Sequence, residues 1–466
     1  MKIGRLRSHF GALALGVVTL SGEARGGGFY LTDRGVRPLG RGGAFIAGAD
    51  DLHATWYNPA GLVEAGRGVL LDASLVLFGN TYTRTLQVDP TMPTVGYRSV
   101  DGAGAPLPVP TVVVSHNFGL RDFMFAAGVM APYAAITTYD QRPDAPQRYS
   151  LFSLDGSLLS VLGAWVAWRP SPAVAVGGGF MLLSGSFVSR LALSACPATI
   201  TCAPEDPDWD SIAQLRVGPI LAPTGNLGVK VIPHRLIALG ASVQFPIQVR
   251  APATLGVRLP GASFYDGASV VGQDAQVAFD LAPVVRVGVE FRPLPRTRVE
   301  LAGVWEGWSV HDEIALMPQG IRIENARGVG TYEVGPVSLA RGFQDTLSVR
   351  LGAETETDLG RDWSLMARAG AAYETSATPL GYTSVLTMDS DKFVGSLGAS
   401  FRRGRLRMDL VFAHMFASSV EVSTANARLY PTAPFRAGPG SPRYPINAGR
   451  YDLSVEVFGM GMQYSF

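Results

Sequence analysis

Residues 27–66 read GGFYLTDRGVRPLGRGGAFIAGADDLHATWYNPAGLVEAG. This stretch is rich in glycine, follows neither the helical period of 3.6 nor the strand period of 2, and closes on a turn, Asn58-Pro59-Ala60-Gly61. The remainder of the chain, 67–466, differs in kind, because about fourteen strand-like runs with alternating apolar residues follow one another to Phe466. We therefore expect an all-β protein in which 27–66 is an irregular plug inside a barrel formed by 67–466.

Composition narrows the class of protein. Charged residues make up 17% of the 466 residues, below the roughly 25% of soluble domains, and 47% of residues are hydrophobic, which argues against disorder. The net charge of +1 offers no overall attraction to nucleic acid. Neither a G-x-S-x-G motif nor a metal-ligand spacing occurs in the sequence. We expect no enzyme activity, no cofactor and no nucleic-acid partner.

Residues 1–26 have the features of a secretory signal peptide. A basic start precedes a short apolar stretch at 10–20, and Ala24-Arg25-Gly26 is a small-x-small cleavage site. No later stretch has 18 consecutive apolar residues, so transmembrane helices are not expected. A closed barrel is the remaining way to satisfy every backbone hydrogen bond in lipid.

Short and long connections between the expected strands alternate along the chain. The strands are expected at 68–84, 109–119, 122–134, 156–168, 173–191, 224–232, 235–249, 274–292, 297–311, 343–358, 362–374, 391–403, 405–422 and 450–466. Short periplasmic turns, long external loops and an even strand number are typical of outer-membrane barrels. Fourteen strands leave a lumen too wide for side chains alone to fill, so the N-terminal plug is expected to occupy it.

Charged residues fall on one face of the expected strands and aliphatic residues on the other. In a membrane barrel the aliphatic face meets lipid and the charged face meets the lumen. The expected lumen charges are Arg286, Glu290, Arg298, Glu300, Arg350, Glu354 and Arg368. They have two interpretations: ion pairs across strands that fix the plug, or an arginine among them that binds a ligand carboxylate.

The last strand changes the phase of its apolar residues. Tyr451, Leu453 and Val455 occupy odd positions, whereas Phe458 and Met460 occupy even ones. A strand of period 2 cannot bury both sets on one face, so we expect a bulge near 457–459. The terminal Phe466 resembles the signal that the barrel assembly machinery reads.

The N-terminal stretch also resembles a known family. Its GF-x-L at 28–31, LGRGGAFIAGADD at 39–51 and YNPAGL at 57–62 are similar to the hatch of the FadL/TodX outer-membrane channels for long-chain fatty acids and hydrocarbons. Ala131-Pro132-Tyr133 resembles the family's third strand, and Arg341-Gly342-Phe343-Gln344-Asp345 the start of a late strand.

The resemblance implies a 14-stranded barrel that binds hydrophobic ligands near the outside and releases them sideways through a kink in the third strand. Ligand-binding or gating roles would then fall to Phe29, Leu31, Asn58, Pro59, Pro132 and Tyr133. Asn58 is alternatively a turn residue with a local backbone bond. Pro132 marks either a break in the barrel wall or the end of a strand.

The two cysteines, Cys196 and Cys202, are separated by five residues. An even pair in an exported chain favours a disulfide that closes a small loop, and a metal pair is the alternative. The neighbouring acidic run, 205–210, is either a solvated loop or a calcium site.

These observations favour passive uptake of hydrophobic small molecules across the outer membrane of a Gram-negative cell. The expected partners are a fatty acid or hydrocarbon ligand, outer-membrane lipid and lipopolysaccharide, and the barrel assembly machinery, with the protein as a monomer. Two alternatives stay open at this point: a structural or adhesive barrel, and an outer-membrane lipid esterase.

Overall fold

The structure is a computed structural model of the whole chain. It describes residues 33–87, 93–104, 107–131, 137–197, 200, 202–203, 205–327, 330–433 and 444–466. Within these ranges no helix is long and apolar enough to cross a bilayer. The signal peptide expected at 1–26 and the first residues of the expected plug lie outside the described residues.

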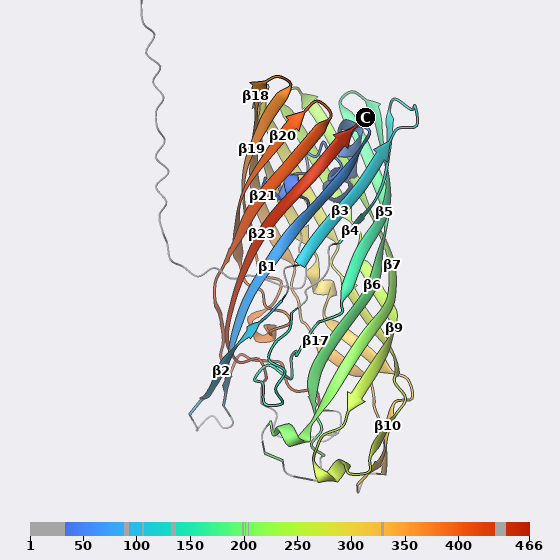
Figure 1. The fold of residues 1–466 in the computed structure, drawn as a ribbon, viewed down its shortest axis with the longest axis vertical. Coiled ribbons are helices and arrows are strands. Elements are labelled where there is room, and N and C mark those ends of the chain that lie inside the picture. Colours follow the sequence, from blue (N-terminus) through green and yellow to red (C-terminus); the bar gives the residue numbers. More distant parts are fainter. Residues whose placement is uncertain are drawn as a thin grey trace, which may run out of the picture.

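Fourteen antiparallel strands close into one barrel (Figure 1). The closure is made by the first and last strands, which pair continuously from Gly68 with Ser465 to Arg84 with Gly449. The barrel strands are β1 (Gly68–Leu86), β3 (Leu107–His116), β4 (Phe123–Met130), β5 (Leu158–Ser171), β6 (Val174–Ser194), β7 (Asp210–His234), β8 (Ile237–Gln244), β12 (Val284–Leu294), β13 (Thr297–Glu306), β18 (Thr346–Gly360), β19 (Trp363–Glu374), β20 (Lys392–Arg403), β21 (Leu406–Ala417) and β23 (Gly449–Ser465).

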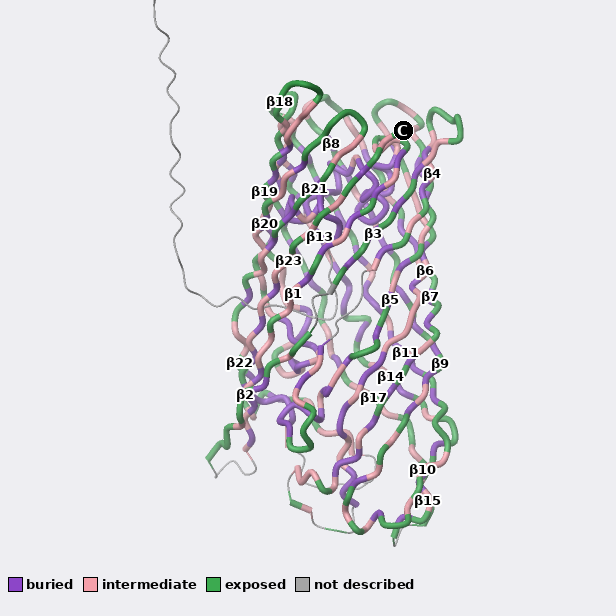
Figure 2. Tube along the Cα trace, in the orientation of Figure 1, coloured by how far each residue is buried: buried purple, intermediate pink, exposed green. Residues whose placement is uncertain are grey.

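Side chains alternate between the two faces of the wall, as the period of a β-strand requires. In β12, Val285, Val287 and Val289 are exposed on the outside, whereas Arg286 and Glu290 are buried in the lumen. Figure 2 shows the same alternation of exposed and buried residues along the tube of many strands. The aliphatic outer surface is suited to lipid contact.

The expected bulge near 457–459 is wrong. Strand β23 pairs with β1 and with β21 without a register shift through this region. Odd-numbered residues face inward along the whole strand, with Tyr451 and Val455 buried and Phe458 and Met460 exposed. The apolar phase changes because the surroundings of β23 change. Its inner face is apolar on the side of the plug away from the short turns, and its outer face is apolar beside the plug.

Two proline dipeptides divide strands that the sequence pattern merged. The expected strand at 235–249 is interrupted at Phe245-Pro246, and the one at 274–292 at Ala282-Pro283. A proline has no N–H for the ladder, so the chain turns out of the barrel at both places. The loops expected at 85–108, 250–272 and 312–341 are also wrong in part, because they contain strands.

The additional strands extend the wall beyond the barrel. Strand β7 pairs with β8 along its second half and with β9 along its first half, and a ladder of β9, β11, β14 and β17 continues from there. Their bounds are β2 (Val95–Gly102), β9 (Ile247–Arg258), β10 (Ser269–Val271), β11 (Asp274–Leu281), β14 (Glu313–Pro318), β15 (Arg322–Ala326), β16 (Gly330–Glu333), β17 (Val337–Ala340) and β22 (Val420–Val422). The short 3₁₀ helices are η2 (Pro207–Trp209), η3 (Ser263–Tyr265), η4 (Trp308–Val310) and η5 (Leu380–Tyr382).

The described part of the N-terminal stretch, 33–66, precedes β1 and is almost entirely buried. Its elements are α1 (Val36–Leu39), α2 (Ala54–Tyr57), η1 (Pro59–Gly61) and α3 (Leu62–Ala65). Figure 1 shows these blue segments inside the barrel at the end with the short turns, near the C-terminus. We call residues 33–66 the plug from here on.

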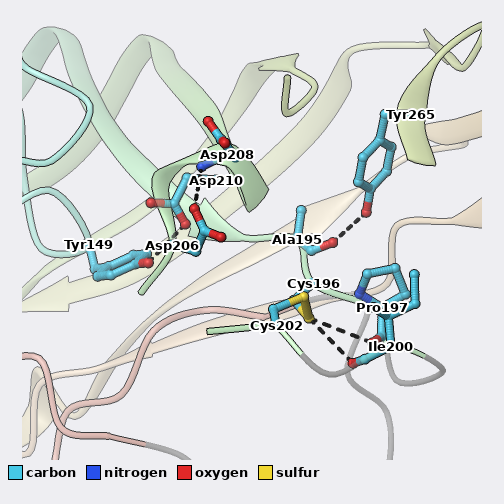
Figure 3. The surroundings of a disulfide bond; sticks show 10 residues. All are labelled: Tyr149, Ala195, Cys196, Pro197, Ile200, Cys202, Asp206, Asp208, Asp210 and Tyr265. Atoms are coloured by element: carbon cyan, nitrogen blue, oxygen red, sulfur yellow. Dashed lines mark hydrogen bonds between the residues drawn. A yellow bond between two sulfur atoms is a disulfide. The ribbon is translucent and has the colours of Figure 1, made fainter. Parts of the chain in front are cut away.

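A disulfide joins Cys196 and Cys202, whose Cα atoms are 6.2 Å apart. Figure 3 shows the bond beside two contacts of the same region, one from Tyr149 to Asp210 and one from Tyr265 to the carbonyl of Ala195. The pair lies between β6 and β7, in the wall extension and far along the chain from the plug. Its position is suited to holding an external connection.

Candidate functional site

One carboxylate of the barrel wall receives the backbone of the plug. Glu300 on β13 is fully buried, and its Oε1 accepts hydrogen bonds from the amides of Ile46 at 2.6 Å and Ala47 at 2.8 Å. Its Oε2 accepts from the amide of Gly48 at 2.9 Å and from Nη2 of Arg41 at 3.1 Å. Four donors on one carboxylate fix the irregular backbone, which has no ladder of its own.

Arg41 also separates two like charges. Glu290 and Glu300 stand directly opposite each other on β12 and β13, an arrangement that is unfavourable without a cation between them. Nη2 of Arg41 lies 2.9 Å from Glu290 Oε2 and 3.1 Å from Glu300 Oε2. Arg292 of β12 also donates to Glu290 Oε1 at 2.9 Å, so cations of the plug and of the wall together neutralise this acidic pair.

A second ion network centres on Arg37 of α1. Its guanidinium donates to Glu354 at 2.9 and 3.1 Å, to Asp50 at 2.5 Å and to Asp51 at 3.0 Å. Burial alone lowers the pKa of Arg37, but the surrounding carboxylates outweigh it and hold the pKa well above the ordinary value. One charged side chain therefore joins α1 both to a later part of the plug, at Asp50 and Asp51, and to β18 of the wall.

The other lumen charges predicted from the sequence lie in the same layer. Arg298 donates to Glu354 at 2.9 Å and to Asp50 at 2.6 Å, and Arg368 pairs with Glu354 from the next strand. Arg350 pairs with Asp33. These contacts agree with the interpretation that the charges fix the plug, since both cross-strand and strand-to-plug pairs occur.

Arg286 is different from the other predicted arginines. Its guanidinium lies 5.8 Å from the ring of Trp56 and contacts Gln244 Oε1 at 3.4 Å. No ion pair joins it to a carboxylate within the described ranges. Its role there is contact with the indole face of α2, a cation–π arrangement.

His53 connects the plug to the first strand. Its Nδ1 lies 2.9 Å from Asp51 Oδ1, and its Nε2 contacts Asp72 of β1. Burial disfavours the imidazolium, but the two carboxylates outweigh it and raise the pKa of His53 to about 9. The ring is therefore charged at pH 7 and forms an ionic bridge between plug and wall.

Asn58 fixes the final turn of the plug. Its Oδ1 accepts from the amide of Ala60 at 3.2 Å, and its Nδ2 donates to the carbonyls of Ile46 and Val229, both at 3.0 Å. Pro59 begins η1 directly afterwards. One side chain thus caps the local turn, as the turn interpretation expects, and also contacts β7; a role of Asn58 or Pro59 in ligand binding or gating stays a prediction.

Sequence reasoning missed a glycine surface on the inner wall. At four of these glycines an added Cβ would collide with the plug. At Gly228 it would lie 2.1 Å from Asn58 Oδ1, and at Gly240 2.6 Å from the Ile46 carbonyl oxygen. At Gly352 it would lie 2.4 Å from the Arg41 carbonyl oxygen, and at Gly370 2.0 Å from the Gly42 amide nitrogen. Pairs of these glycines face one another across strands: Gly177 with Gly228, Gly240 with Gly288, and Gly352 with Gly370. The signal was present as glycines at lumen-facing positions, next to the predicted charges.

On the side of the plug away from the short turns, the lumen opens into a cavity. It holds about 1490 Å³ of space, counting the part open to solvent, with Asp33, Arg34 and Leu39 of the plug at one boundary. Its apolar wall includes Val76, Val109, Phe187, Phe343, Leu386 and Met415. Charged residues such as Arg341, Glu374 and Lys392 also line it. An apolar wall combined with polar groups that orient the ligand is the usual form of a small-molecule site. We call it the lumen cavity.

One side of the lumen cavity is aromatic and carries a cation. The rings of Trp308 and Phe343 are 5.9 Å apart, and His311 lies 5.1 Å from Phe343. Burial lowers the pKa of Arg341 to about 10, and burial lowers that of His311 to about 4. No described carboxylate forms an ion pair with Arg341, in contrast to Arg298, Arg350 and Arg368. In the sequence, Arg341 stood out only as part of a motif that resembles the family, not as a candidate binding residue.

Two outer cavities continue the lumen cavity into the wall extension. One is lined by aliphatic residues of β6, β7, β9, β14 and β17, including Leu193, Leu255 and Leu339. A third cavity shares Leu215 and Leu339 with it and shares Phe187 and Arg341 with the lumen cavity. The shared residues place the three cavities next to one another between the external strands and the plug.

Four predicted site residues cannot be placed. Phe29, Leu31, Pro132 and Tyr133 lie outside the described residues. Strand β4 ends just before this segment, with Met130 paired to Thr111 of β3 and Val161 of β5. The roles expected for these residues stay predictions.

Known proteins resemble the chain in sequence profile and in fold. The profile of the outer membrane protein transport proteins (OMPP1/FadL/TodX) matches residues 17–466. A FadL homologue of Pseudomonas aeruginosa has a TM-score of 0.71 at 19% identity, covering 94% of this chain and 100% of its own. No curated protein sequence matches.

Two toluene transporters share the fold. TbuX of Ralstonia pickettii gives a TM-score of 0.57 at 16% identity, covering 94% of this chain and 99% of its own. TodX of P. putida gives 0.59 at 17% identity, covering 89% and 94%. The chain belongs to the OMPP1/FadL/TodX family of outer-membrane transport proteins, and it is an outer-membrane β-barrel.

Proposed function

From family membership and from the lumen cavity, we propose that this protein is a passive channel for hydrophobic small molecules. The molecule enters through the outer cavities, binds in the lumen cavity and leaves without an energy source. The observation that carries the proposal is the lumen cavity with its apolar wall, which borders a plug held by ion networks and has two further cavities beside it.

Exit through the wall is favoured over exit through the plug. The axial path crosses the networks of Arg37 and Arg41, and an apolar molecule cannot replace their hydrogen bonds. The wall beside the cavity has fewer ladder contacts among the described residues. There, residues 107–109 of β3 form a ladder with β1 alone, and residues 158–160 of β5 with β6 alone, whereas the Pro110 carbonyl accepts from the Ala131 amide at 3.0 Å. Val109, in this part of β3, lines the lumen cavity.

The same region supports a role for the predicted residues Pro132 and Tyr133. In the sequence they follow the end of β4 directly, beside this part of β3, and they lie outside the described residues. Pro108 and Pro110 of β3 provide no N–H for a partner strand there. Lateral release is therefore proposed beside this proline-containing part of β3. Gating by Phe29 and Leu31 belongs to the same proposal, as they precede Asp33 at the cavity boundary.

Arg341 is the residue we assign to an acidic ligand. A guanidinium that has lost most of its water and lacks a described anion favours a carboxylate. Arg341→Gln is expected to weaken binding of a long-chain fatty acid about tenfold or more, and to leave binding of the corresponding methyl ester within about twofold. Equal losses for acid and ester would remove this role.

A pair of variants on one strand tests uptake itself. Ala413 of β21 faces the lumen cavity, whereas Leu410 of the same strand is exposed on the outer surface. Ala413→Trp fills the cavity and should abolish uptake of a radiolabelled fatty acid or hydrocarbon by reconstituted protein, whereas Leu410→Trp should not. Full uptake by the Ala413→Trp variant would exclude the lumen cavity as the route.

A further inference from the structure

One carboxyl oxygen in the lumen cavity has no described partner. Glu306, the last residue of β13, is buried with 2% of its surface exposed and lines the cavity. Its Oε2 accepts a hydrogen bond from Nε1 of Trp308 at 2.7 Å. Its Oε1 has no hydrogen-bond partner among the described residues. Leaving a buried acceptor unpaired is costly, so such an atom commonly marks a place that another molecule fills.

The other acidic side chains of the cavity are held by cations. Glu374 Oε1 lies 2.9 Å from Nζ of Lys392, and its Oε2 lies 3.6 Å from Arg350. Asp389 lies 2.9 Å from the same lysine, and Asp33 pairs with Arg350. Glu306 therefore differs from its neighbours, because Trp308 fixes one oxygen and leaves the other directed at no described donor.

The chemistry of this oxygen selects a class of ligand. In its ionised form the carboxyl group accepts hydrogen bonds and donates none, so this oxygen then favours an O–H group over an ether or a hydrocarbon. The indole of Trp308 fixes the orientation of the carboxylate, and the rings of Trp308 and Phe343 provide an apolar wall beside it. A second carboxylate at this point would be repelled, so the preferred group is neutral.

We propose that Glu306 Oε1 accepts a hydrogen bond from a hydroxyl group of the transported molecule, so that the channel prefers hydroxyl-bearing hydrophobic molecules to those without a donor. This inference rests on the proposed uptake function and adds a specificity-determining residue to it. Arg341 would bind an anionic group of the ligand, whereas Glu306 would bind a neutral group that donates a hydrogen bond.

The test compares two ligands that differ in the donor alone, dodecan-1-ol and its methyl ether. Equilibrium binding of each radiolabelled compound is measured on full-length protein in lipid nanodiscs, with empty nanodiscs subtracted. Wild-type protein is expected to bind the alcohol at least about tenfold more tightly than the ether. In Glu306→Gln the ratio is expected to fall to about one, because Trp308 keeps the amide oxygen and the NH₂ group then faces the cavity.

Glu374→Gln is the matched control, since it changes a carboxylate of the same cavity whose oxygens are already in ion pairs. It should retain the wild-type ratio within about twofold, and heat-modifiable mobility in electrophoresis shows that each variant barrel is folded. A wild-type ratio near one would overturn the inference and leave uptake standing, and this measurement needs no variant. A preference that survives in Glu306→Gln would also overturn it. Binding of neither compound above empty nanodiscs would reject both this inference and the proposed function.

Discussion

Replacing Glu300 by glutamine should undock the plug while leaving the barrel closed. The substitution keeps the size of the side chain and the two bonds from Ile46 and Ala47 to Oε1. It places an NH₂ group against two donors, the Gly48 amide and Nη2 of Arg41, where Oε2 accepts at 2.9 and 3.1 Å. The ladders that Glu300 forms with Glu290 and Gly352 involve backbone alone.

The magnitude follows from the two lost bonds. A hydrogen bond to a charged group contributes about 1.5–3 kcal/mol, so docking should weaken by roughly 3–6 kcal/mol. At the lower value, the undocked population increases about a hundredfold. Hydrogen exchange at the amides of residues 46–48, followed by mass spectrometry, should speed up by about the same factor if exchange occurs from the undocked state.

Glu356→Gln on the neighbouring strand β18 is the control. Its carboxylate contacts Arg402 at 3.9 Å and is partly exposed, so exchange in the plug should stay unchanged. The reasoning is refuted if Glu300→Gln leaves the protection of residues 46–48 at the wild-type level while its barrel is folded.

Three further predictions concern the same contacts. Gly370→Ala should prevent docking of the plug, because the added Cβ would lie 2.0 Å from the Gly42 amide nitrogen. Gly395→Ala should not, because its Cβ would lie 3.7 Å from Phe416. The protease sensitivity of the plug distinguishes the two variants. Docking of the plug should weaken by about 3 kcal/mol between pH 6.5 and about 9. Because the pKa of His53 is raised in the docked state, the stabilisation from charged His53 is complete below pH 6.5 and is lost as the pH rises through 9. In His53→Gln, hydrogen exchange in the plug should lose this pH dependence. Thiol labelling of denatured, unreduced protein should find no reactive Cys196 or Cys202, and two reactive thiols would contradict the disulfide.

Sequence periodicity was sufficient to predict the barrel and to predict that its charged residues face the lumen. Alternation in β12 and β13 placed Arg286, Glu290 and Glu300 on one face, and only a lumen can accommodate that many charges in a membrane wall. The pattern failed where one strand passes through two environments. In β23, apolar residues move from the inner to the outer face because the inner neighbour changes from cavity to plug, and the sequence suggested a bulge.

The site was less accessible to sequence reasoning than the fold. The contacts of Glu300 with Ile46, Ala47 and Gly48 join residues about 250 positions apart, and periodicity carries no information on such pairs. Arg341 and Glu306 are distinguished from other charged residues by the partners that they lack among the described residues, which no local pattern encodes. The glycines of the inner wall could be seen at lumen-facing positions in the sequence, but their role depends on the plug backbone opposite, which the sequence does not place.

The claim that hydrophobic molecules occupy the lumen cavity and leave without crossing the plug is tested most directly by photo-crosslinking. A long-chain probe with an alkyl diazirine is bound to reconstituted protein, irradiated during uptake, and mapped by mass spectrometry. We predict labels on cavity residues such as Val109, Phe343 and Met415, and none on the plug residues Ile46 and Ala47 or on Ala302 beside them. Labels on 40–49 that increase with transport would show that the molecules pass through the plug and would contradict lateral release.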